Sequence, residues 1–573
     1  MQNSKRFTRR DVLKAGVLGV GLGVAGPLLA ACGAPAPSTA TPAATAAPAP
    51  AKTAAPAAAK TAAPPQPTAP PAKASTKTTW ASKPIVHGSC CEPNTIDPAA
   101  VSGAATDGLI VNAAYEGLTR YTTKGEIEPA LATSWKISDD SLTYVFKLRE
   151  GVKFHDGSDF NAGAVKVSFE RMKAMKLGVS LLLDSVGEVK VVDPTTVQVT
   201  LSKPDAQFWF GVPSIKIVSP KALEANRKSG DWAQDFFREN TVGTGPYRME
   251  RWDRGRQVEM VAFDGYWKGW EGKHIQKYII RFGMDMASRL LAMEKGEIHI
   301  IDWAGLSEVR RMANNPKIVI RAGQANWSSF YQWMNTQSGP LKDRRVRQAM
   351  MLAFPYKDML EVMGGYATPM TSPVPDYMVG YCKSFEAKQD LDKARALLAE
   401  AGYANGFTIR QPYKSDNEVR RLAAQLYQEA LAKLNVKVVL EDITWAKFLQ
   451  SQSKLETAYD TVSAGSGSPV PYAGTMLYNL GHSSVQGTAG NYSFYANPKF
   501  DSLVEQAIRL SPSDPKANDL LCQAQKMLID DAVLIPVMSN QYIELRRAEL
   551  KAPEFDSYAY PYDVHPYEMY LEG

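Results

Sequence analysis

The stretch SDNEVRRLAAQLYQEALAKLNVKVVL, residues 415–440, decides the class of fold. Its apolar residues recur every three or four positions over 419–434, which predicts an amphipathic helix, and residues 415–418 have the spacing of a capping box. The helix leads directly into the apolar run 436–440, which predicts a strand. A helix that leads straight into a strand is typical of an α/β domain.

Other segments support a mixed α/β chain. Residues 143–149 and 196–201 alternate between apolar and polar side chains, as half-buried strands do. Residues 390–401 place Leu and Ala on one helical face, with Asp390 as the expected N-cap and Gly402 just after the C-terminus.

The N-terminal residues resemble an export signal. Arg9 and Arg10 stand in SKRFTRRDVLKAG, before a weakly apolar run over 15–31, as in twin-arginine signals. The run ends in LAAC, which resembles a lipobox whose cysteine, Cys32, becomes lipidated. The alternative is a transmembrane anchor, for which about 17 uncharged residues are at the short limit. We therefore expect residues 1–32 to be a lipoprotein signal.

Residues 33–79 contain almost only Ala, Pro, Thr, Ser and Lys. Such a segment has no apolar set to bury, and frequent proline opposes an Ala-rich helix. We expect a disordered tether that holds a globular body near a membrane surface.

The net charge of +6 misrepresents the body. Residues 1–79 contain nine Lys or Arg and one Asp, so residues 80–573 have a net charge of −2. A nearly neutral body lacks the excess of basic residues that binds a phosphate backbone, which makes nucleic acid an unexpected partner. Its 494 residues are too many for one ordinary core, and two or three lobes are expected.

The stretch VHGSCCEPNTIDP, residues 86–98, first suggests a metal or redox site. The chain has no CxxC or HExxH motif, so a structural zinc site is poorly supported. For Cys90 and Cys91 three states stay open: a vicinal disulfide, a bond from one of them to Cys382 or Cys522, or free thiols.

A set of short motifs runs in order from about residue 83 to the C-terminus. The motifs are Thr95-Ile-Asp-Pro98, Tyr115-Glu-Gly-Leu118, Asp140–Arg149, Gly151-Val-Lys-Phe-His-Asp-Gly157, Val167-Ser-Phe169, Gly243-Thr-Gly-Pro-Tyr247, Tyr266-Trp267, Gly296-Glu-Ile298, Arg345-Val-Arg-Gln-Ala349 and Leu534-Ile-Pro536. Their order and spacing resemble the extracytoplasmic solute-binding proteins of family 5, the peptide, nickel and oligosaccharide receptors of ABC importers.

The resemblance implies a two-lobed α/β fold like that of periplasmic binding proteins, of the large three-domain type II subclass, with a hinge and a cleft between the lobes. The expected first lobe comprises 80–118, 211–322 and 536–573; 119–210 form a subdomain inserted into it, and 323–535 form the second lobe. Such a protein is a monomer without cofactor or catalytic activity. Its partners are a small-molecule solute, the ABC permease and ATPase, and, through Cys32, the membrane outside the cytoplasm.

Loops that follow strands at the lobe interface supply the expected solute contacts, because strand ends face the crevice in such lobes. The candidates are Cys90, Cys91, Glu92, Trp303, Trp333, Asn335, Tyr413, Trp445, Ser466 and Tyr472, with Trp327 and Tyr331 as further wall residues; no metal ligand is expected. The resemblance places the basic cluster Arg344, Arg345 and Arg347 at a helix start, where a solvated or salt-bridged role is favoured.

The ligand class follows from a departure from the family pattern. Peptide receptors of the family hold the ligand's α-ammonium with an aspartate, whereas the corresponding loop here, 464–475, contains no acid. Because a buried ammonium needs a counter-charge, we expect an oligosaccharide, an opine-like compound or a modified peptide. An ordinary peptide is the alternative, with Glu92 as the nearest carboxylate. A hydrolase with Ser466 in a loose nucleophile elbow, and a receptor that signals without import, are more remote hypotheses.

Overall fold

The structure is a computed structural model of the chain, and residues 78–572 contain all the parts that it describes. The described ranges are 78–81, 83–101, 106–122, 125–228, 230–322, 328–414, 417–487, 490–511, 514–540, 543–552 and 565–572. The predicted signal, Cys32, nearly all of the tether, and Trp327 lie outside them.

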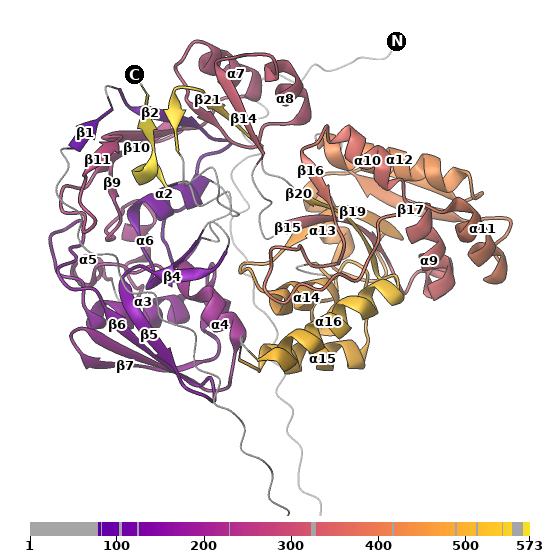
Figure 1. The fold of residues 1–573 in the computed structure, drawn as a ribbon, viewed down its shortest axis with the longest axis horizontal. Coiled ribbons are helices and arrows are strands. Elements are labelled where there is room, and N and C mark those ends of the chain that lie inside the picture. The colour runs from indigo at the N-terminus through magenta and orange to yellow at the C-terminus, as the bar shows by residue number, and fades with distance from the viewer. Residues whose placement is uncertain are drawn as a thin grey trace, which may run out of the picture. The chain divides into compact units, whose positions relative to one another are not determined.

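A seven-stranded sheet forms the first lobe (Figure 1). Its strands, in spatial order, are β14 (Ile318–Ala322), β21 (Ile543–Arg547), β13 (Ile300–Ile301), β2 (Ile85–Gly88), β12 (Lys277–Arg281), β10 (Gln257–Ala262) and β9 (Tyr247–Asp253). β2 pairs in parallel with both β12 and β13, so the carboxyl ends of these three strands meet at one edge. The helices of this lobe are α2 (Thr106–Ala114), α5 (Pro220–Asn226), α6 (Gln234–Phe237), α7 (Met286–Glu294) and α8 (Leu306–Met312). Short pairs flank the sheet: β1 (Thr78–Trp80) with β11 (Gly272–His274), and β22 (Leu550–Lys551) with β23 (Tyr570–Leu571), next to η6 (Pro566–Glu568).

A second, antiparallel sheet lies in the segment predicted to be an insertion. Its strands, in spatial order, are β5 (Ala132–Ile137), β6 (Thr143–Leu148), β8 (Thr196–Leu201) and β7 (Val186–Asp193). β6 and β8 confirm the two strands predicted from alternation. The other elements are the hairpin β3 (Thr119–Tyr121) and β4 (Ile127–Pro129), the helices α3 (Ala162–Met175) and α4 (Ala206–Gly211), and η1 (Ser180–Leu183) and η2 (Val212–Ser214).

The second lobe contains a four-stranded sheet and a separate parallel pair. The sheet has the order β16 (Ala367–Pro369), β20 (Leu534–Asn540), β15 (Ser328–Met334), β19 (Thr461–Gly467), and the pair is β17 (Thr408–Tyr413) with β18 (Lys437–Asp442). The helices are α9 (Arg344–Ala353), α10 (Tyr356–Val362), α11 (Leu391–Glu400), α12 (Glu418–Ala432), α13 (Trp445–Gln452), α14 (Ala473–Gly481), α15 (Pro498–Ile508) and α16 (Pro515–Asp530), with η3 (Gly339–Lys342) and η4 (Ser483–Val485). The boundary that we expected at 535/536 falls inside β20, which pairs with β15 and β16 up to Asn540.

The helix-to-strand unit of the opening stretch is present as α12 and β18. Its helix begins at Glu418, and the N-cap is Asn417, whose side chain accepts a hydrogen bond from the Arg420 amide. The capping box predicted at 415–418 is therefore wrong, because an asparagine directly before the helix already satisfies an orphan amide. Ser415 and Asp416 themselves lie outside the described residues. The predicted caps of α11 are confirmed: Asp390 accepts from the Lys393 amide, and Gly402 has φ +86°.

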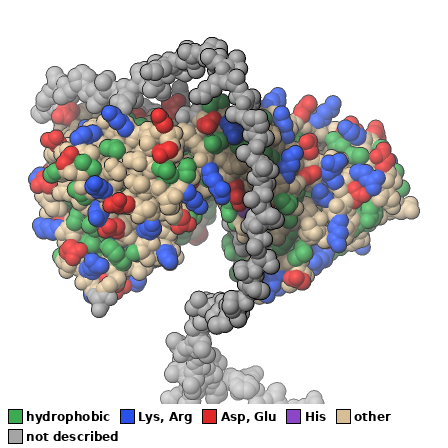
Figure 2. Space-filling model, turned by 90° about the horizontal axis from the view of Figure 1, so that it is seen from below, with side chains coloured by type: hydrophobic (Ala, Val, Ile, Leu, Met, Phe, Trp, Pro, Cys, Tyr) green, Lys and Arg blue, Asp and Glu red, His purple; other side chains and the backbone are tan. Residues whose placement is uncertain are grey.

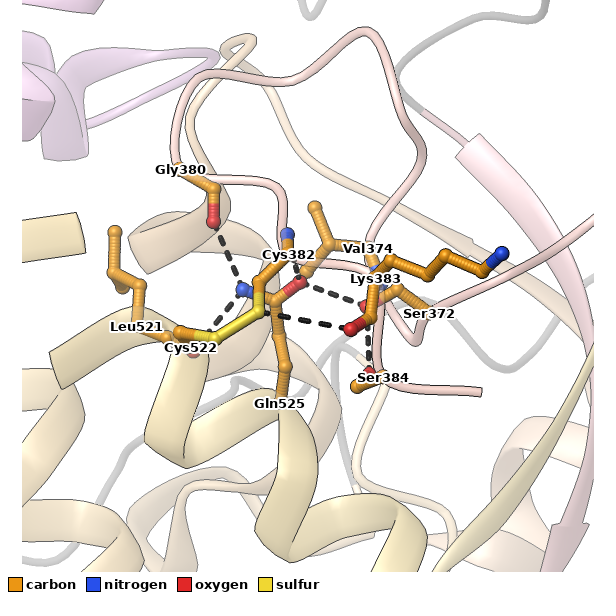
Figure 3. The surroundings of a disulfide bond; sticks show 9 residues. All are labelled: Ser372, Val374, Gly380, Cys382, Lys383, Ser384, Leu521, Cys522 and Gln525. Atoms are coloured by element: carbon orange, nitrogen blue, oxygen red, sulfur yellow. Dashed lines mark hydrogen bonds between the residues drawn. A yellow bond between two sulfur atoms is a disulfide. The ribbon is translucent and has the colours of Figure 1, made fainter. Parts of the chain in front are cut away.

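A disulfide joins Cys382 to Cys522 on α16, across 140 residues (Figure 3). Beside it, the fully buried Gln525 accepts from the Ser372 hydroxyl and the Cys382 amide and donates to the Gly380 carbonyl. This bond was not among the pairings that we weighed, each of which involved Cys90 or Cys91. It fixes the loop that carries Val379 to α16.

Charged side chains are interspersed on the face seen in Figure 2, with Lys and Arg next to Asp and Glu. The basic cluster on α9 follows this pattern. Arg345 pairs with Asp343 at 2.7 Å, Arg344 lies 3.8 Å from Asp531, and the buried Arg347 donates to the Leu341 and Asp531 carbonyls. These contacts confirm the expected structural role of the cluster at a helix start.

Candidate functional site

Two predicted site residues meet at the end of the parallel pair β17 and β18. Tyr413 ends β17, and Trp445 is the first residue of α13, which follows β18 after a Thr444 N-cap. They line a small pocket that is open to solvent. Its other lining residues are Pro412, Lys414, Arg420, Ile443, Thr444, Phe448 and Ser463.

Aromatic rings form one wall of this strand-end pocket. The Trp445 ring stacks on Phe448 with 4.8 Å between centroids and 16° between planes, and the Trp445 side chain remains 38% exposed. The guanidinium of Arg420 lies 4.7 Å from the centroid of the Trp445 ring, in cation–π contact. An exposed ring that is held flat by its neighbours is suited to stack on a planar group of a solute.

Basic residues contribute to the lining of the pocket. Lys414 and Arg420 line it, and no Asp or Glu of the described ranges does. Below it, Ser463 belongs to a buried polar network in which Gln411 donates to Ser463 and Ser463 donates to Gln332. Because these polar groups bond to one another, they hold the floor of the pocket in place.

On the first lobe, the predicted loop after β2 begins with a buried polar network. The Ser89 hydroxyl donates to Asp302 at 2.7 Å, and Arg289 lies 3.4 Å from the same carboxylate. Cys90 and Cys91 follow, and both are exposed. Trp303, directly after Asp302, is 42% exposed and has φ +54°.

Glu92 bonds to its own lobe. Its carboxylate accepts hydrogen bonds from the Trp252 indole at 2.9 Å and the Gly255 amide at 3.1 Å, and Arg254 lies 3.7 Å away. The hairpin of β9 and β10 thus uses much of the hydrogen-bonding capacity of this carboxylate. A solute ammonium would have to compete with these contacts.

Five other candidates are buried among protein atoms. Trp333 and Tyr331 are fully buried, and Asn335 accepts from the Gln337 amide. Tyr472 is 1% exposed and stacks on Phe210 of the inserted segment, with 4.9 Å between centroids. The Ser466 side chain is buried as well, and its hydroxyl has no hydrogen-bond partner among the described residues. None of these residues lines the strand-end pocket.

A larger pocket, which we did not predict, lies mostly in the first lobe and the inserted segment. Charged residues in or just after two family motifs line it, among them Glu116, Arg120 and Lys268. Burial lowers the pKa of the Lys268 ammonium. Pro469, from the acid-free loop of the second lobe, also contributes to the lining. The YEGL and YW motifs were the signals that could have located it.

Two kinds of feature are absent from the described ranges. There, no group of three or more His, Cys, Asp or Glu is arranged to hold a metal ion. No helix of that part of the chain is long and apolar enough to cross a membrane.

The sequence model of the family described as "Bacterial extracellular solute-binding proteins, family 5 Middle" matches residues 126–488, more than half of the chain. The chain belongs to this family. The resemblance expected from the ordered motifs is confirmed, and so is the fold class.

Curated relatives of this solute-binding protein cover most of its length. It is 28% identical over 482 residues to the probable D,D-dipeptide-binding periplasmic protein DdpA of Escherichia coli, with 82% of this chain and 91% of the relative covered. It is 29% identical over 504 residues to heme-binding protein A of Haemophilus influenzae, with 81% and 88% covered.

Solved structures agree with the fold. The ABC transporter-associated periplasmic binding protein DppA from Helicobacter pylori, in complex with peptide STSA, superposes with a TM-score of 0.70 at 26% identity, covering 86% of this chain and 98% of that one. The substrate-binding protein CtaP from Listeria monocytogenes gives a TM-score of 0.77 at 22% identity, covering 86% and 99%. The chain is thus an extracytoplasmic solute-binding protein of family 5.

Proposed function

We propose that this protein is a lipid-anchored receptor that captures a small organic solute between its two lobes and delivers it to an ABC import permease. Family membership and the ABC transporter-associated relative support the receptor role. The twin arginines and the LAAC sequence that ends at Cys32 support export and anchoring. Closure of the lobes over the solute is a population shift, driven by contacts that form only in the closed state.

The strand-end pocket carries the proposal for the solute. Tyr413, Trp445 and Phe448 provide rings, Lys414 and Arg420 provide basic groups, and none of the described acidic residues lines the pocket. Such a surface binds a carboxylate that is attached to a planar or apolar group. We therefore favour a modified peptide or an opine-like compound over a neutral oligosaccharide.

An ordinary peptide is the second candidate, because a relative at 26% identity was solved with a bound peptide. Two observations weigh against it. The loop 464–475 has no acid to pair with an α-ammonium, and the Glu92 carboxylate already bonds to Trp252 and Gly255. A free amine buried against this surface would lack a counter-charge.

Matched peptides test the ligand class. The purified protein is first examined by native mass spectrometry for a retained solute and is then screened by thermal shift. The screen uses di- to pentapeptides with a free N-terminus, their N-acetylated forms, and neutral glycans. We expect larger shifts with the acetylated peptides than with their free-amine partners. Equal or larger shifts with free amines would overturn the ligand proposal, and a response to glycans alone would exclude the carboxylate requirement.

A further inference from the structure

Cys90 and Cys91 place their sulfur atoms side by side at the carboxyl end of β2. The two Sγ atoms lie 2.9 Å apart, and both residues are exposed. A disulfide bond is about 2.05 Å long, so closing the gap moves each sulfur by less than about half an ångström. Neighbouring residues in a chain usually direct their side chains apart, and this pair does not.

The surroundings of the two thiols do not form a metal site. Thr106 lies 3.8 Å from the Cys91 sulfur, and Asp302 bonds to Ser89 and Arg289. His87, three residues earlier, is fully buried and pairs with the Tyr278 hydroxyl at 2.7 Å. With no third ligand aimed at them in the described part of the chain, the two sulfurs face each other and the solvent.

We propose that Cys90 and Cys91 are a reversible redox site that closes to a vicinal disulfide. The oxidant is an external disulfide, either a small compound or a disulfide oxidoreductase. One thiolate attacks a sulfur of that disulfide and releases one thiol, which leaves a mixed disulfide on the protein. The second sulfur then loses its proton to solvent, attacks the first and releases the second thiol. Two protein S–H bonds are replaced by one S–S bond, and the external disulfide is reduced to two thiols.

The environment of Cys90 disfavours its thiolate. Partial desolvation of its sulfur, its hydrogen bond with Cys91 and the negative charge of Asp302 together raise the pKa of the Cys90 thiol to about 12. Because the thiolate is the nucleophile, reaction of Cys90 in either step requires the loss of a tightly held proton.

The vicinal bond should be easier to reduce than the second disulfide of the chain. Adjacent Cα atoms are about 3.8 Å apart, below the range of about 4.4–6.8 Å that disulfides prefer, so the ring is strained. The Cα atoms of Cys382 and Cys522 lie 5.2 Å apart, inside that range, and Gln525 supports their loop (Figure 3). Strained and exposed disulfides are the labile ones.

The test requires no knowledge of the solute. The full chain is equilibrated in buffers of reduced and oxidised glutathione at increasing ratios, quenched with acid, alkylated with N-ethylmaleimide and mapped by peptide mass. We expect the peptide with Cys90 and Cys91 to carry either two labels or none, and to lose both together as the buffer becomes oxidising. The ratio of reduced to oxidised glutathione at which half of this pair is reduced should be at least about tenfold lower than the corresponding ratio for Cys382 and Cys522. Two labels at every ratio, or glutathione adducts as the main oxidised form, would overturn the proposal.

Two variants separate the site from its alternatives. Cys91→Ser leaves a lone thiol that cannot close a ring, so any oxidation must end as an adduct on Cys90. The double variant Cys382→Ser/Cys522→Ser removes the other partners, and the paired loss of labels at Cys90 and Cys91 should persist in it. Disappearance of the paired loss there would mean exchange with the other disulfide and would sink the proposal. Circular dichroism checks that each variant is folded.

Discussion

Asp97 and Arg171 form a buried, two-pronged ion pair. The Nη1–Oδ1 and Nη2–Oδ2 distances are 2.7 and 2.6 Å, and the side chains are 0% and 1% exposed. Asp97 belongs to the loop after β2, whereas Arg171 belongs to α3 of the inserted segment. Arg171 also donates to the Trp232 carbonyl, and Asp97 accepts from the Ala99 amide. The Thr95–Pro98 motif and a residue two positions after the Val167–Phe169 motif therefore meet in one contact that ties the inserted segment to the first lobe.

Removing one partner of this pair should be costly. Arg171→Met leaves the Asp97 carboxylate buried without a counter-charge, and we expect the free energy of unfolding to fall by about 3–5 kcal/mol. The double variant Asp97→Leu/Arg171→Met buries no charge and should recover a large part of the loss. Urea unfolding at pH 7 measures both. A single variant that loses less than about 1 kcal/mol would contradict the structural role of the pair.

His155 should make stability fall in acid. Its Nδ1 accepts from the Gly243 amide and its Nε2 donates to the Gly245 carbonyl, so a proton on Nδ1 would face an N–H group. Burial lowers the pKa of His155 to about 4, below the usual 6.5 of an unfolded chain. Its contribution is therefore complete above pH 6.5 and is lost as the pH falls toward 4, by up to about 3 kcal/mol.

Unfolding free energies at pH 7, 5.5 and 4 measure this slope. Burial lowers the pKa of His299 to about 4 as well, so the wild-type slope contains both residues. His155→Gln keeps one donor and one acceptor but cannot titrate. It should therefore reduce the slope of the unfolding free energy against pH by the contribution of about one proton. An unchanged slope in this variant would show that His155 does not control the acid response.

Periodicity and caps could be read from the sequence wherever local chemistry decides them, as for β6, β8 and the two ends of α11. Pairing between distant motifs could not. Nothing in YEGL shows that Glu116 accepts from the Trp267 indole, or that Gly243 and Gly245 must lack side chains because a Cβ there would lie within 3 Å of the Ala114 backbone.

The candidate site was predictable to a similar extent. The sequence placed Tyr413 and Trp445 separately at strand ends, and the parallel pairing of β17 with β18 brings the two together at one edge. The same rule misplaced Trp333, since β15 is a central strand of a covered sheet and its side chains are buried on both faces. Tyr472 was misplaced for another reason: Phe210, more than 250 residues away, covers its ring. Long-range packing of this kind leaves no local signal.

The Cys382–Cys522 disulfide should stabilise the second lobe and the acid-free loop together. Val379, three residues before Cys382, donates its amide to the Pro471 carbonyl and accepts from the Ala473 amide. Because the bond closes a loop of 140 residues, Cys382→Ser/Cys522→Ser should lower the free energy of unfolding by about 2–5 kcal/mol. Urea unfolding with and without reductant measures it. Reductant should shift the wild type and leave the double variant unchanged, and an equal shift in both would assign the effect to Cys90 and Cys91.

Arg420 and its neighbour Arg421 offer a matched test of the strand-end pocket. Arg420 lines the pocket over Trp445, whereas Arg421 is outside the pocket lining and bonds to Gln425 on the same helix. If the pocket binds a carboxylate, Arg420→Gln should raise the Kd of the best N-acetylated peptide at least about tenfold, which corresponds to about 1.4 kcal/mol. Arg421→Gln should leave it unchanged.

Trp445 separates stacking from charge at the same pocket. Trp445→Ala should raise the Kd by a similar factor, and Trp445→Phe should restore part of the affinity because it keeps a flat ring. Isothermal titration at two salt concentrations distinguishes the two contributions. The effect of Arg420→Gln should shrink at high salt, whereas that of Trp445→Ala should remain. If Arg420→Gln and Arg421→Gln change the Kd equally, the cationic pocket does not hold the carboxylate, and the solute is bound elsewhere between the lobes.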